Sequence, residues 1–584
     1  MKVMGITGFV FMAAVAVADE RVPLWPDGKM PDAQPHQIAA MLQEQEAPGF
    51  NPDEHRFPYI EWMPPPARPN GICMILISGG GYRRLADAVH VKIWNERFTA
   101  IGCQCVKLVY RTPRPQGIEI WRTAWDDGQR AVRLVRRDAR KRGFDAERIG
   151  TISMSAGSHL ALLLSSSSMT PAYTPVDDLD RSVPCHINFA ITGAIAYAVK
   201  GKDDSVRLDD SFKFDAKTAP MCMFHGSVDT ITPLSSTYAY RELRRHGIPA
   251  ELHLFADRKH GFWGFNPGKP ESTAYDNWFD RAREFMVQLG FLGEIEKEVP
   301  LMECFSTDFH DTAKYEKRNL WPDGKMPLRQ LKEDGPEAQC VPYLEWYVPA
   351  KLSTKAVQIV FSGGGYNGNT PDKFEVAPIR RFLNEKGMAV VTMKYRMPRP
   401  KDLPKHATAQ ADLQRCIRLV RAEAPKRGLD PDRIGIMGSS AGGHLTLMGA
   451  TSSRSPAYPP IDEIDEIPCK VQWAVAVYPA YGLTEGAESP NGKSGRNDLA
   501  QLVPEFAFDA DTCPMLFLHG DSDVWSAMNS VMAWEKLRQM GIGCDLHTLA
   551  LRGHCFQRTA SSGTGSYTWM GRVWEFLNHK KFNR

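Results

Sequence analysis

Two segments of closely similar sequence, one in each half of the chain, constrain the fold more than any other feature. Residues 148–160 read RIGTISMSAGSHL, and residues 433–445 read RIGIMGSSAGGHL. In both segments an apolar run typical of a buried strand passes through a turn of small residues into a helix-like pattern. Gly-x-Ser-x-Gly in this setting is a nucleophile elbow, which exposes a serine hydroxyl at the carboxyl end of a strand. We therefore predict Ser155 and Ser440 as two nucleophiles.

The first elbow departs from this pattern at one of its glycines. Ser153 stands where the second elbow has Gly438, and Ser158 stands where it has Gly443. A Cβ at such positions crowds the neighbouring strand or helix, although serine is small enough to be tolerated at some cost in geometry. If one of the two sites has lost activity, we expect it to be the first.

The similarity extends along the chain and indicates an internal duplication. Residues 24–31 and 320–327 are identical and read LWPDGKMP. The two copies begin 296 residues apart. A repeat unit of that length exceeds the roughly 20–50 residues of solenoid repeats and suits two large domains. We predict a first domain over residues 19–293, a linker over residues 294–316 and a second domain over residues 317–584.

Strand-like and helix-like segments alternate in each half. Apolar runs at residues 75–78 and 359–362 are both followed by Gly-Gly-Gly-Tyr, and an amphipathic helix pattern precedes each elbow. Strands that alternate with helices favour a mostly parallel sheet with helices on both faces. The predicted fold class is therefore α/β, with two tandem domains of this kind.

A serine nucleophile needs a base that a third group orients. Three histidines of the first half have a counterpart in the second. The pair on the elbow helix and the pair before a glycine at a strand end are better explained as structural. The third pair follows the last strand pattern of each half, where the chain order Ser, acid, His places the base. The pair on the elbow helix is His159 with His444, and the pair before a glycine is His225 with His519. The third pair, His260 and His554, supplies the predicted bases.

Two carboxylates compete for the acid of the second half. Asp523 matches Asp229 of the first half, whereas Asp521 matches Ser227. The distance of 31 residues from Asp229 to His260 recurs between Asp523 and the second base. The predicted triads are therefore Ser155, Asp229 and His260 in the first half, and Ser440, Asp523 and His554 in the second.

A second matched pair of aspartates precedes the serines. Asp127 and Asp412 lie on the helix patterns before the elbows, and Arg111 and Arg396 stand at matched positions. We expect ion pairs between these arginines and aspartates instead of a catalytic role.

An oxyanion at the reacting carbonyl needs backbone N–H donors. The residue after each serine opens a helix, where free N–H groups and the positive end of the helix dipole face the site. The glycine loops bring backbone N–H groups close to a ligand and supply the other donor. The predicted donors are Ala156 with Gly80 or Gly81, and Ala441 with Gly364 or Gly365.

Aromatic residues near the predicted sites are candidates for contact with substrate. Trp525 follows Asp523 by two residues, and Trp263 follows His260 by three. Tryptophan stacks on sugar rings or lines an acyl pocket, but core packing explains these residues equally well. The candidates are Tyr82, Trp263, Tyr366 and Trp525.

The amino terminus has the pattern of a signal peptide. Lys2 precedes an apolar stretch that ends in Ala16-Val17-Ala18, which suits signal peptidase. A buried strand or a membrane anchor is the alternative, but the stretch is short for a bilayer span. We expect residues 1–18 to be removed and the protein to be secreted or periplasmic. The twelve cysteines then permit disulfides, although their spacing defines no framework.

The charge balance and the absence of metal motifs exclude several classes of protein. A formal net charge of +3, with both signs mixed along the sequence, does not suit a nucleic-acid-binding surface. The sequence has no Cys-x-x-Cys pair and no His-Glu-x-x-His helix, so no zinc site is indicated. We expect no cofactor, no metal and no membrane partner after signal cleavage.

Together, these motifs resemble those of secreted α/β-hydrolase esterases, in particular the acetylxylan esterase and feruloyl esterase group. The resemblance rests on the Leu-Trp-Pro-Asp-Gly openings, the Gly-Gly-Gly-Tyr loops, Tyr-Arg at Tyr110 and Tyr395, and Ser-Ala-Gly-x-His-Leu at both serines. It implies a serine carboxylesterase that removes acetyl or feruloyl groups from plant polysaccharide such as xylan. The implied reaction passes through an acyl-enzyme, with one site in each domain and an acylated polysaccharide or oligosaccharide as substrate.

Two other functions stay open at this point. A secreted prolyl-oligopeptidase-like peptidase uses the same order of catalytic residues, although the sequence has no propeller-like repeat. In the other alternative, one or both domains keep the fold as a non-catalytic carbohydrate-binding or scaffold module.

Overall fold

The computed structural model describes most of the chain. The predicted signal peptide, Trp263 and most of the predicted linker lie outside the described residues. The chain forms two compact units, one of Met1–Ile152 with Ser168–Asn188 and one of Ser153–Ser167 with Phe189–Arg584. The limits of these units differ from those of the predicted domains, residues 19–293 and 317–584. The division into these two domains stays a prediction. The described residues are 20–26, 29–45, 58–201, 205–261, 278–293, 298–300, 314–328, 341–368, 375–484, 501–561 and 568–583.

A sheet of sixteen strands carries the fold. Its order is β1-β2-β4-β3-β5-β6-β9-β10-β19-β18-β17-β16-β14-β15-β13-β12. The first eight strands and the last eight, read inward from each edge, follow the same chain order, with two antiparallel edge strands before parallel ones. The α/β class and the mostly parallel sheet are thus confirmed. The expectation of two separate sheets is wrong, because β10 pairs with β19 and joins the strands into one sheet.

The first unit holds the amino-terminal strands and the helices between them. Its β3 strand is buried along its whole length, as is usual for a parallel strand covered on both faces. The strands are β1 (Glu20–Pro23), β2 (Tyr59–Trp62), β3 (Cys73–Ile77), β4 (Gln104–Val109) and β5 (Ile149–Met154), whose last two residues belong to the second unit; the helices are α1 (Pro35–Gln45), α2 (Asp87–Ala100), α3 (Arg122–Arg142) and α5 (Asp178–Ser182).

A buried ion pair connects the opening motif to the helix that precedes the elbow. Arg111 donates to Asp127 at 2.9 Å, and the indole N–H of Trp25 donates to the same carboxylate at 2.8 Å. Trp25 is buried, so the Leu-Trp-Pro opening belongs to the framework and is not exposed for substrate. The same contacts join Arg396, Asp412 and Trp321 in the second unit, at 3.0 and 2.7 Å.

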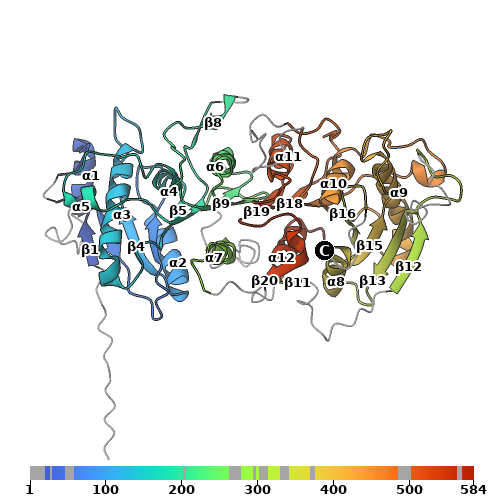
Figure 1. Cartoon of the computed structure of the whole chain (residues 1–584), viewed down its shortest axis with the longest axis horizontal. Helices are drawn as coiled ribbons and strands as arrows, with labels where there is room; N and C mark the ends of the chain where they lie inside the picture. The colour runs from blue at the N-terminus through green and yellow to red at the C-terminus, as the bar shows by residue number, and fades with distance from the viewer. Residues whose placement is uncertain are drawn as a thin grey trace, which may run out of the picture. The chain divides into compact units, whose positions relative to one another are not determined.

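The second unit holds both elbow helices, α4 (Ala156–Ser166) and α10 (Ala441–Thr451). Figure 1 shows α9, α10 and α11 on one side of the strands and α8 and α12 on the other, so helices cover both faces. The remaining strands are β6 (Phe189–Gly193), β7 (Val199–Lys200), β8 (Arg207–Leu208), β9 (Met221–Gly226), β10 (Ala250–Phe255), β11 (Glu298–Pro300), β12 (Lys314–Asn319), β13 (Tyr343–Val348), β14 (Val357–Phe361), β15 (Ala389–Lys394), β16 (Ile434–Ser439), β17 (Trp473–Val477), β18 (Met515–Gly520), β19 (Asp545–Leu549) and β20 (Thr559–Ser561); the helices are α6 (Leu234–Arg245), α7 (Trp278–Gln288), α8 (Val376–Glu385), α9 (Ala407–Glu423), α11 (Met528–Gln539) and α12 (Thr568–His579).

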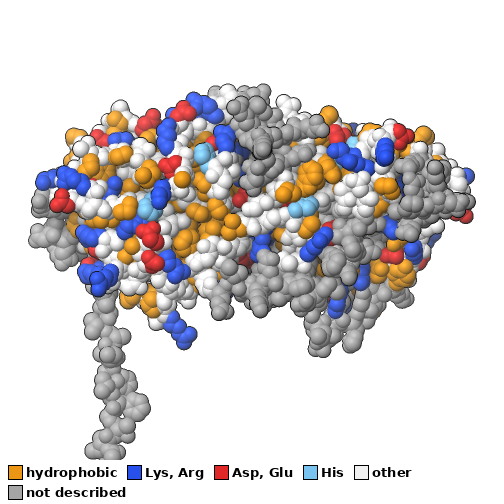
Figure 2. Space-filling view, in the orientation of Figure 1, with side chains coloured by type: hydrophobic (Ala, Val, Ile, Leu, Met, Phe, Trp, Pro, Cys, Tyr) orange, Lys and Arg blue, Asp and Glu red, His pale blue; other side chains and the backbone are white. Residues whose placement is uncertain are grey.

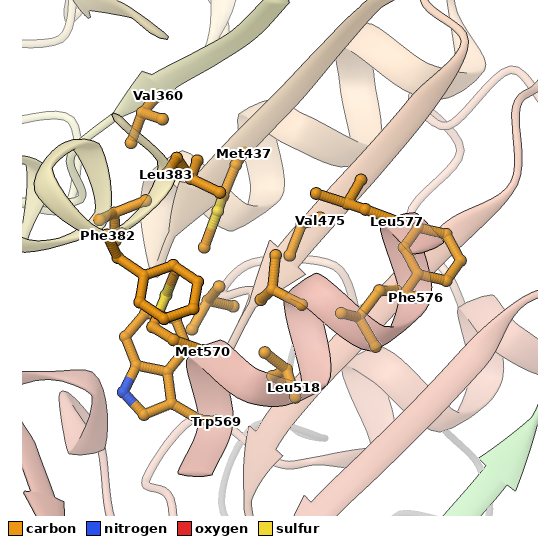
Figure 3. Close-up of a cluster of buried hydrophobic side chains, with 14 of the residues drawn as sticks. Val360, Phe382, Leu383, Met437, Val475, Leu518, Trp569, Met570, Phe576 and Leu577 are labelled. Atoms are coloured by element: carbon orange, nitrogen blue, oxygen red, sulfur yellow. The ribbon is translucent and has the colours of Figure 1, made fainter. Parts of the chain in front are cut away.

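Apolar side chains of α8 and α12 pack against strands β14, β16, β17 and β18 (Figure 3). Burial of apolar surface stabilises the folded state by about 25 cal/mol per Å² removed from water. This layer supports the strands whose carboxyl ends carry the second elbow. The side chains include Phe382 and Leu383 of α8, Trp569, Met570, Phe576 and Leu577 of α12, and Val360, Met437, Val475 and Leu518 of the strands.

The junction of β10 and β19, here called the seam, is polar as well as apolar. His253 lies opposite His547 in the antiparallel register, with their Nδ1 atoms 3.1 Å apart. Both rings are fully buried. The helices beside the seam form ion pairs across it, between Arg241 of α6 and Glu535 of α11, between Arg281 of α7 and Glu575 of α12, and between Arg572 of α12 and Glu284 of α7.

Charged side chains of both signs are interspersed on the face of the molecule in Figure 2. Among the described residues, none of the helices combines the length and the apolar character that a membrane span requires.

Candidate active sites

Each predicted nucleophile occupies a strained turn between a strand and a helix. Ser440 follows β16 with φ 56° and ψ −118°, and Ser155 follows β5 with φ 57° and ψ −120°. Such left-handed values are unusual for a serine and concentrate at functional sites. The turn at Ser440 leaves no room for larger neighbours: a Cβ on Gly438 would lie 2.5 Å from the carbonyl oxygen of Gly442. The sequence therefore folds into the elbow that its glycines predict.

The second predicted triad forms a continuous line of hydrogen bonds. His554 Nε2 lies 2.8 Å from Ser440 Oγ. His554 Nδ1 lies 2.9 Å from one carboxylate oxygen of Asp523 and 3.0 Å from the other. The Asp523 side chain is fully buried, whereas the His554 side chain is 22% exposed. The serine hydroxyl thus has a base within proton-transfer distance, and that base is oriented by a carboxylate.

The first predicted triad has the same arrangement. His260 Nε2 lies 3.1 Å from Ser155 Oγ, and its Nδ1 lies 2.9 Å from Asp229. The Asp229 side chain is fully buried and the His260 side chain is 34% exposed. All three residues belong to the second unit. The side chain of His260 is thus more exposed than that of His554.

The two departures of the first elbow from the glycine pattern compensate each other. Ser153 Oγ lies 3.2 Å from Ser158 Oγ, and Ser158 donates to the carbonyl oxygen of Gly193 at 2.8 Å. At the second elbow a Cβ on Gly443, the match of Ser158, would lie 2.8 Å from Pro479. The first elbow satisfies its two added hydroxyls within the fold, and its backbone angles match those of the second.

The competing acid of the second half lies at the seam. Asp521 accepts from Tyr240 at 2.9 Å and from Arg244 at 2.6 Å, both on α6. Asp523 instead accepts the backbone N–H of Trp525 at 2.8 Å while it faces His554. The match of Asp523 to Asp229 therefore selects the aspartate that faces the base.

The histidines before the acid loops brace those loops. His519 Nε2 donates to the carbonyl oxygen of Trp525 at 2.7 Å, and its Nδ1 lies 2.8 Å from Ser530 Oγ. His225 makes the same contacts with Ile231 and Ser236. Both rings are fully buried, and burial lowers the pKa of each from 6.5 to about 4.

These two histidines make folding sensitive to acid. Their folded-state pKa lies below the value of 6.5 for an unburied ring, so the stabilisation is present above pH 6.5 and is lost as the pH falls through about 4. We expect the free energy of unfolding in urea to fall over this range by up to about 1.4 kcal/mol per pH unit for each histidine. His519→Gln should reduce that slope. Equal slopes in the parent and the variant would contradict this prediction.

The glycine loops have the backbone that only glycine adopts without strain. Gly364 and Gly365 have φ 110° and 65°, and Gly80 and Gly81, in the first unit, have 124° and 65°. The second loop lies against the nucleophile, because a Cβ on Gly363 would be 2.9 Å from Ser440 Cβ. Ala441 begins α10 directly after the serine, and Ala156 begins α4 in the same way.

The tyrosines of these loops lie inside the fold. Tyr366 is 1% exposed, and its hydroxyl lies 2.9 Å from His444 Nδ1. Tyr82 is fully buried and packs edge-on against Tyr110, with ring centroids 5.9 Å apart. Both rings are packed inside the fold in this structure, and their contact with a substrate stays a prediction. Trp263 lies outside the described residues, and Trp525 is partly exposed.

Tyr481 is a site residue that the sequence reasoning missed. Its hydroxyl would be 3.4 Å from a Cβ on Gly365. Its ring stacks on Tyr366 at 6.2 Å and meets Trp525 edge-on at 4.6 Å, and Lys405 Nζ lies 4.2 Å from its centroid. It has a strained φ of 60°. The available signal was its position just after β17, the strand that pairs with the elbow strand.

Two groups of metal-ligand type occur among the described residues. Their ligand atoms lie within 4.8 Å of one another in each group. The charges of Arg572 and Arg281, after burial, lower the pKa of His253 in the first group, and the charge of Lys405 acts in the same direction on His444 in the second. Such positive neighbours oppose the binding of a cation. The groups are Cys222, Glu251 and His253, and His406, His444 and Glu505.

Comparison with known proteins identifies the family of the chain. The BD-FAE family model matches residues 62–188 and 344–537, together more than half of the chain. The probable carboxylic ester hydrolase LipM of Mycobacterium tuberculosis is 32% identical over 194 residues, which is 30% of this chain and 44% of LipM. An acetylxylan esterase of Xylanibacter ruminicola is 26% identical over 241 residues, 39% of this chain and 45% of the esterase. The chain thus matches less than half the length of these curated relatives.

A solved structure, the acetyl ester-xyloside bifunctional hydrolase from Caldicellulosiruptor lactoaceticus, aligns with a TM-score of 0.37 and 24% identity. The alignment covers 47% of this chain and 97% of that one. Each of the two stretches matched by the family model contains one elbow serine. With more than half of its residues matched by this family model, the chain belongs to the BD-FAE family.

Proposed function

We propose that this protein is a serine carboxylesterase with two active sites, at Ser155 and Ser440, which arose by tandem duplication. The observation that carries the proposal is the unbroken line from carboxylate to imidazole to serine hydroxyl, present twice. The repeated strand order and the two stretches matched by the family model support the duplication.

The geometry of the second site suits acyl transfer. His554 Nε2 takes the proton as Ser440 Oγ attacks the carbonyl carbon of the ester, and Asp523 stabilises the imidazolium through Nδ1–H. The N–H of Ala441, with that of Gly364 or Gly365, stabilises the oxyanion. His554 then gives its proton to the leaving alkoxide oxygen. Water, activated by the same imidazole, hydrolyses the acyl-enzyme and restores the serine.

The proposed substrate is an acetyl or feruloyl ester on a plant polysaccharide such as xylan. The relationship to an acetylxylan esterase supports an acetylated polysaccharide. The partly exposed aromatic pair of Tyr481 and Trp525 beside the second site suits a sugar ring or an aromatic acyl group. Secretion after removal of residues 1–18 is part of the proposal, because such substrates lie outside the cell.

The test compares three substrates with the full chain. These are p-nitrophenyl acetate, acetylated xylan with released acetate measured, and a proline p-nitroanilide. We expect both esters to be hydrolysed and the anilide to be left intact, since the proposed reaction is ester hydrolysis. Hydrolysis of the anilide alone would favour the peptidase. Inactivity toward all three, together with binding to xylan, would favour the carbohydrate-binding module.

A further inference from the structure

A buried carboxylate that belongs to neither triad lies close to the second site. Glu375 directly precedes α8 and is 2% exposed. One of its oxygens, Oε2, accepts the backbone N–H of Gly363 at 2.9 Å and the hydroxyl of Ser439 at 2.9 Å. Gly363 begins the glycine loop, and Ser439 is the last residue of the elbow strand. Glu375 therefore connects two of the segments that build the site.

The same carboxylate reaches the third segment, which carries the catalytic histidine. Arg558 donates to Glu375 Oε1 at 3.3 Å. Gln557 donates to Ser439 Oγ at 3.1 Å. Both residues follow His554 closely in sequence, and Gln557 is buried. The two oxygens of one side chain thus join the glycine loop, the elbow and the histidine segment.

The atoms that Glu375 holds adjoin the reacting groups. Ser439 is bonded to the nucleophile Ser440, and Gly363 precedes the proposed donors Gly364 and Gly365. A Cβ on Gly363 would lie 2.7 Å from the carbonyl oxygen of Ser439, so the two backbones are already in contact. A small shift of either segment changes the distance between the serine and the oxyanion donors, on which the rate depends steeply.

The contact also decides which N–H groups are left for the substrate. The N–H of Gly363 is occupied by Glu375. The oxyanion donors of this loop must therefore come from Gly364 or Gly365. Because Arg558 pairs with the carboxylate, the negative charge behind the loop is partly balanced. A buried carboxylate with hydrogen bonds on both oxygens is well suited to holding loops in place.

The first site cannot form the same network. Met154 stands where the second half has Ser439, and its thioether has no hydrogen to donate. At the positions of Gln557 and Arg558 the first half has Trp263 and Gly264, of which glycine has no side chain. The network is therefore specific to the second half of the chain.

We propose that Glu375 is a positioning residue of the second active site, which fixes the glycine loop against the elbow and the histidine segment. This inference rests on the proposed function. The two sites therefore differ in how they are held: the Ser440 site depends on Glu375 in addition to its triad aspartate, and the Ser155 site is held without this network.

The test follows both serines in one protein. A fluorophosphonate probe is added to the full chain, and the labelling rates of Ser155 and Ser440 are measured separately by peptide mass spectrometry. Glu375→Gln keeps a side-chain oxygen for Gly363 and Ser439, whereas Glu375→Met fills a similar volume without an acceptor. We expect Glu375→Met to slow the labelling of Ser440 by about 10- to 100-fold. Ser155 should be labelled at the parental rate, and Glu375→Gln should recover most of the loss.

A steady-state measurement separates positioning from substrate binding. In a Ser155→Ala background, Glu375→Met should lower kcat for p-nitrophenyl acetate and leave KM close to the parental value, because Glu375 is buried away from the substrate. Equal losses in the Met and Gln variants, or slowing of both serines together, would overturn the proposal in favour of general stability. Parental labelling of Ser440 in Glu375→Met would also overturn it. If neither serine of the parent protein is labelled, the proposed function itself fails.

Discussion

Replacement of both Ser155 and Ser440 by alanine is expected to lower the turnover of p-nitrophenyl acetate by about 10⁶-fold. The expectation follows from the hydroxyls of Ser155 and Ser440, which lie 3.1 and 2.8 Å from a histidine Nε2 atom. A buried carboxylate orients each of these histidines. Without the hydroxyl, only the oxyanion donors and substrate binding remain to assist water. Initial rates under saturating substrate give the measurement.

The single variants show how the activity is divided. Because each triad is built from its own three residues, Ser155→Ala should keep the share of the second site, and Ser440→Ala should keep that of the first. Ser455→Ala, at an exposed serine of the second half, is the matched control and should keep the full rate. Full activity in the double variant would refute the serine mechanism. Loss of all activity in Ser440→Ala alone would indicate that the first half is a binding module or an inactive domain.

Exchange of Asp523 for asparagine, in a Ser155→Ala background, is expected to lower kcat by about 10⁴-fold. Asp523 accepts from His554 Nδ1 with both oxygens within 3.0 Å, so it fixes the tautomer in which Nε2 is free to take the serine proton. An asparagine in the same place can offer an N–H to the ring and favour the wrong tautomer. The measurement is kcat with the rate-against-pH profile of the remaining site.

The neighbouring aspartate supplies the control for this prediction. Asp521 receives two donors from α6 and does not face His554. Asp521→Asn should lower the urea midpoint of unfolding, because it leaves Arg244 buried without its charged partner. Its kcat for the second site should stay near the parental value. The reverse result, a slow Asp521 variant and an active Asp523 variant, would assign the acid to Asp521.

Much of the site geometry could be predicted from local sequence. The elbow is a short-range feature, because its glycines are needed within five residues of the serine, so Ser155 and Ser440 could be found from one segment each. The aspartate and histidine that line up with each serine could be predicted because the chain repeats them at the same spacing of 31 residues. The ion pairs of Asp127 and Asp412 could be predicted for the same reason, since both partners recur together.

What the sequence did not reveal depends on contacts between distant segments. Glu375 joins residues 12, 64 and 183 positions away, and nothing in its own neighbourhood indicates those partners. Tyr481 contacts Tyr366, which lies 115 residues earlier in the chain, and Trp525, which lies 44 residues later. The tryptophans of the opening motifs donate their indole N–H groups to buried aspartates about 100 residues away, which no local pattern indicates. The single sheet results from the pairing of β10 with β19, and no local sequence pattern predicts that pairing.

The seam has a consequence for which partners each half of the chain can accept. Arg241 and Glu535 occupy corresponding positions, 294 residues apart, and so do Arg281 and Glu575. A symmetric pair made from two first halves would bring arginine to arginine at both points, and one made from two second halves would bring glutamate to glutamate. Like charges at such contacts are unfavourable. These two contacts therefore favour the pairing of a first half with a second half over the pairing of two identical halves.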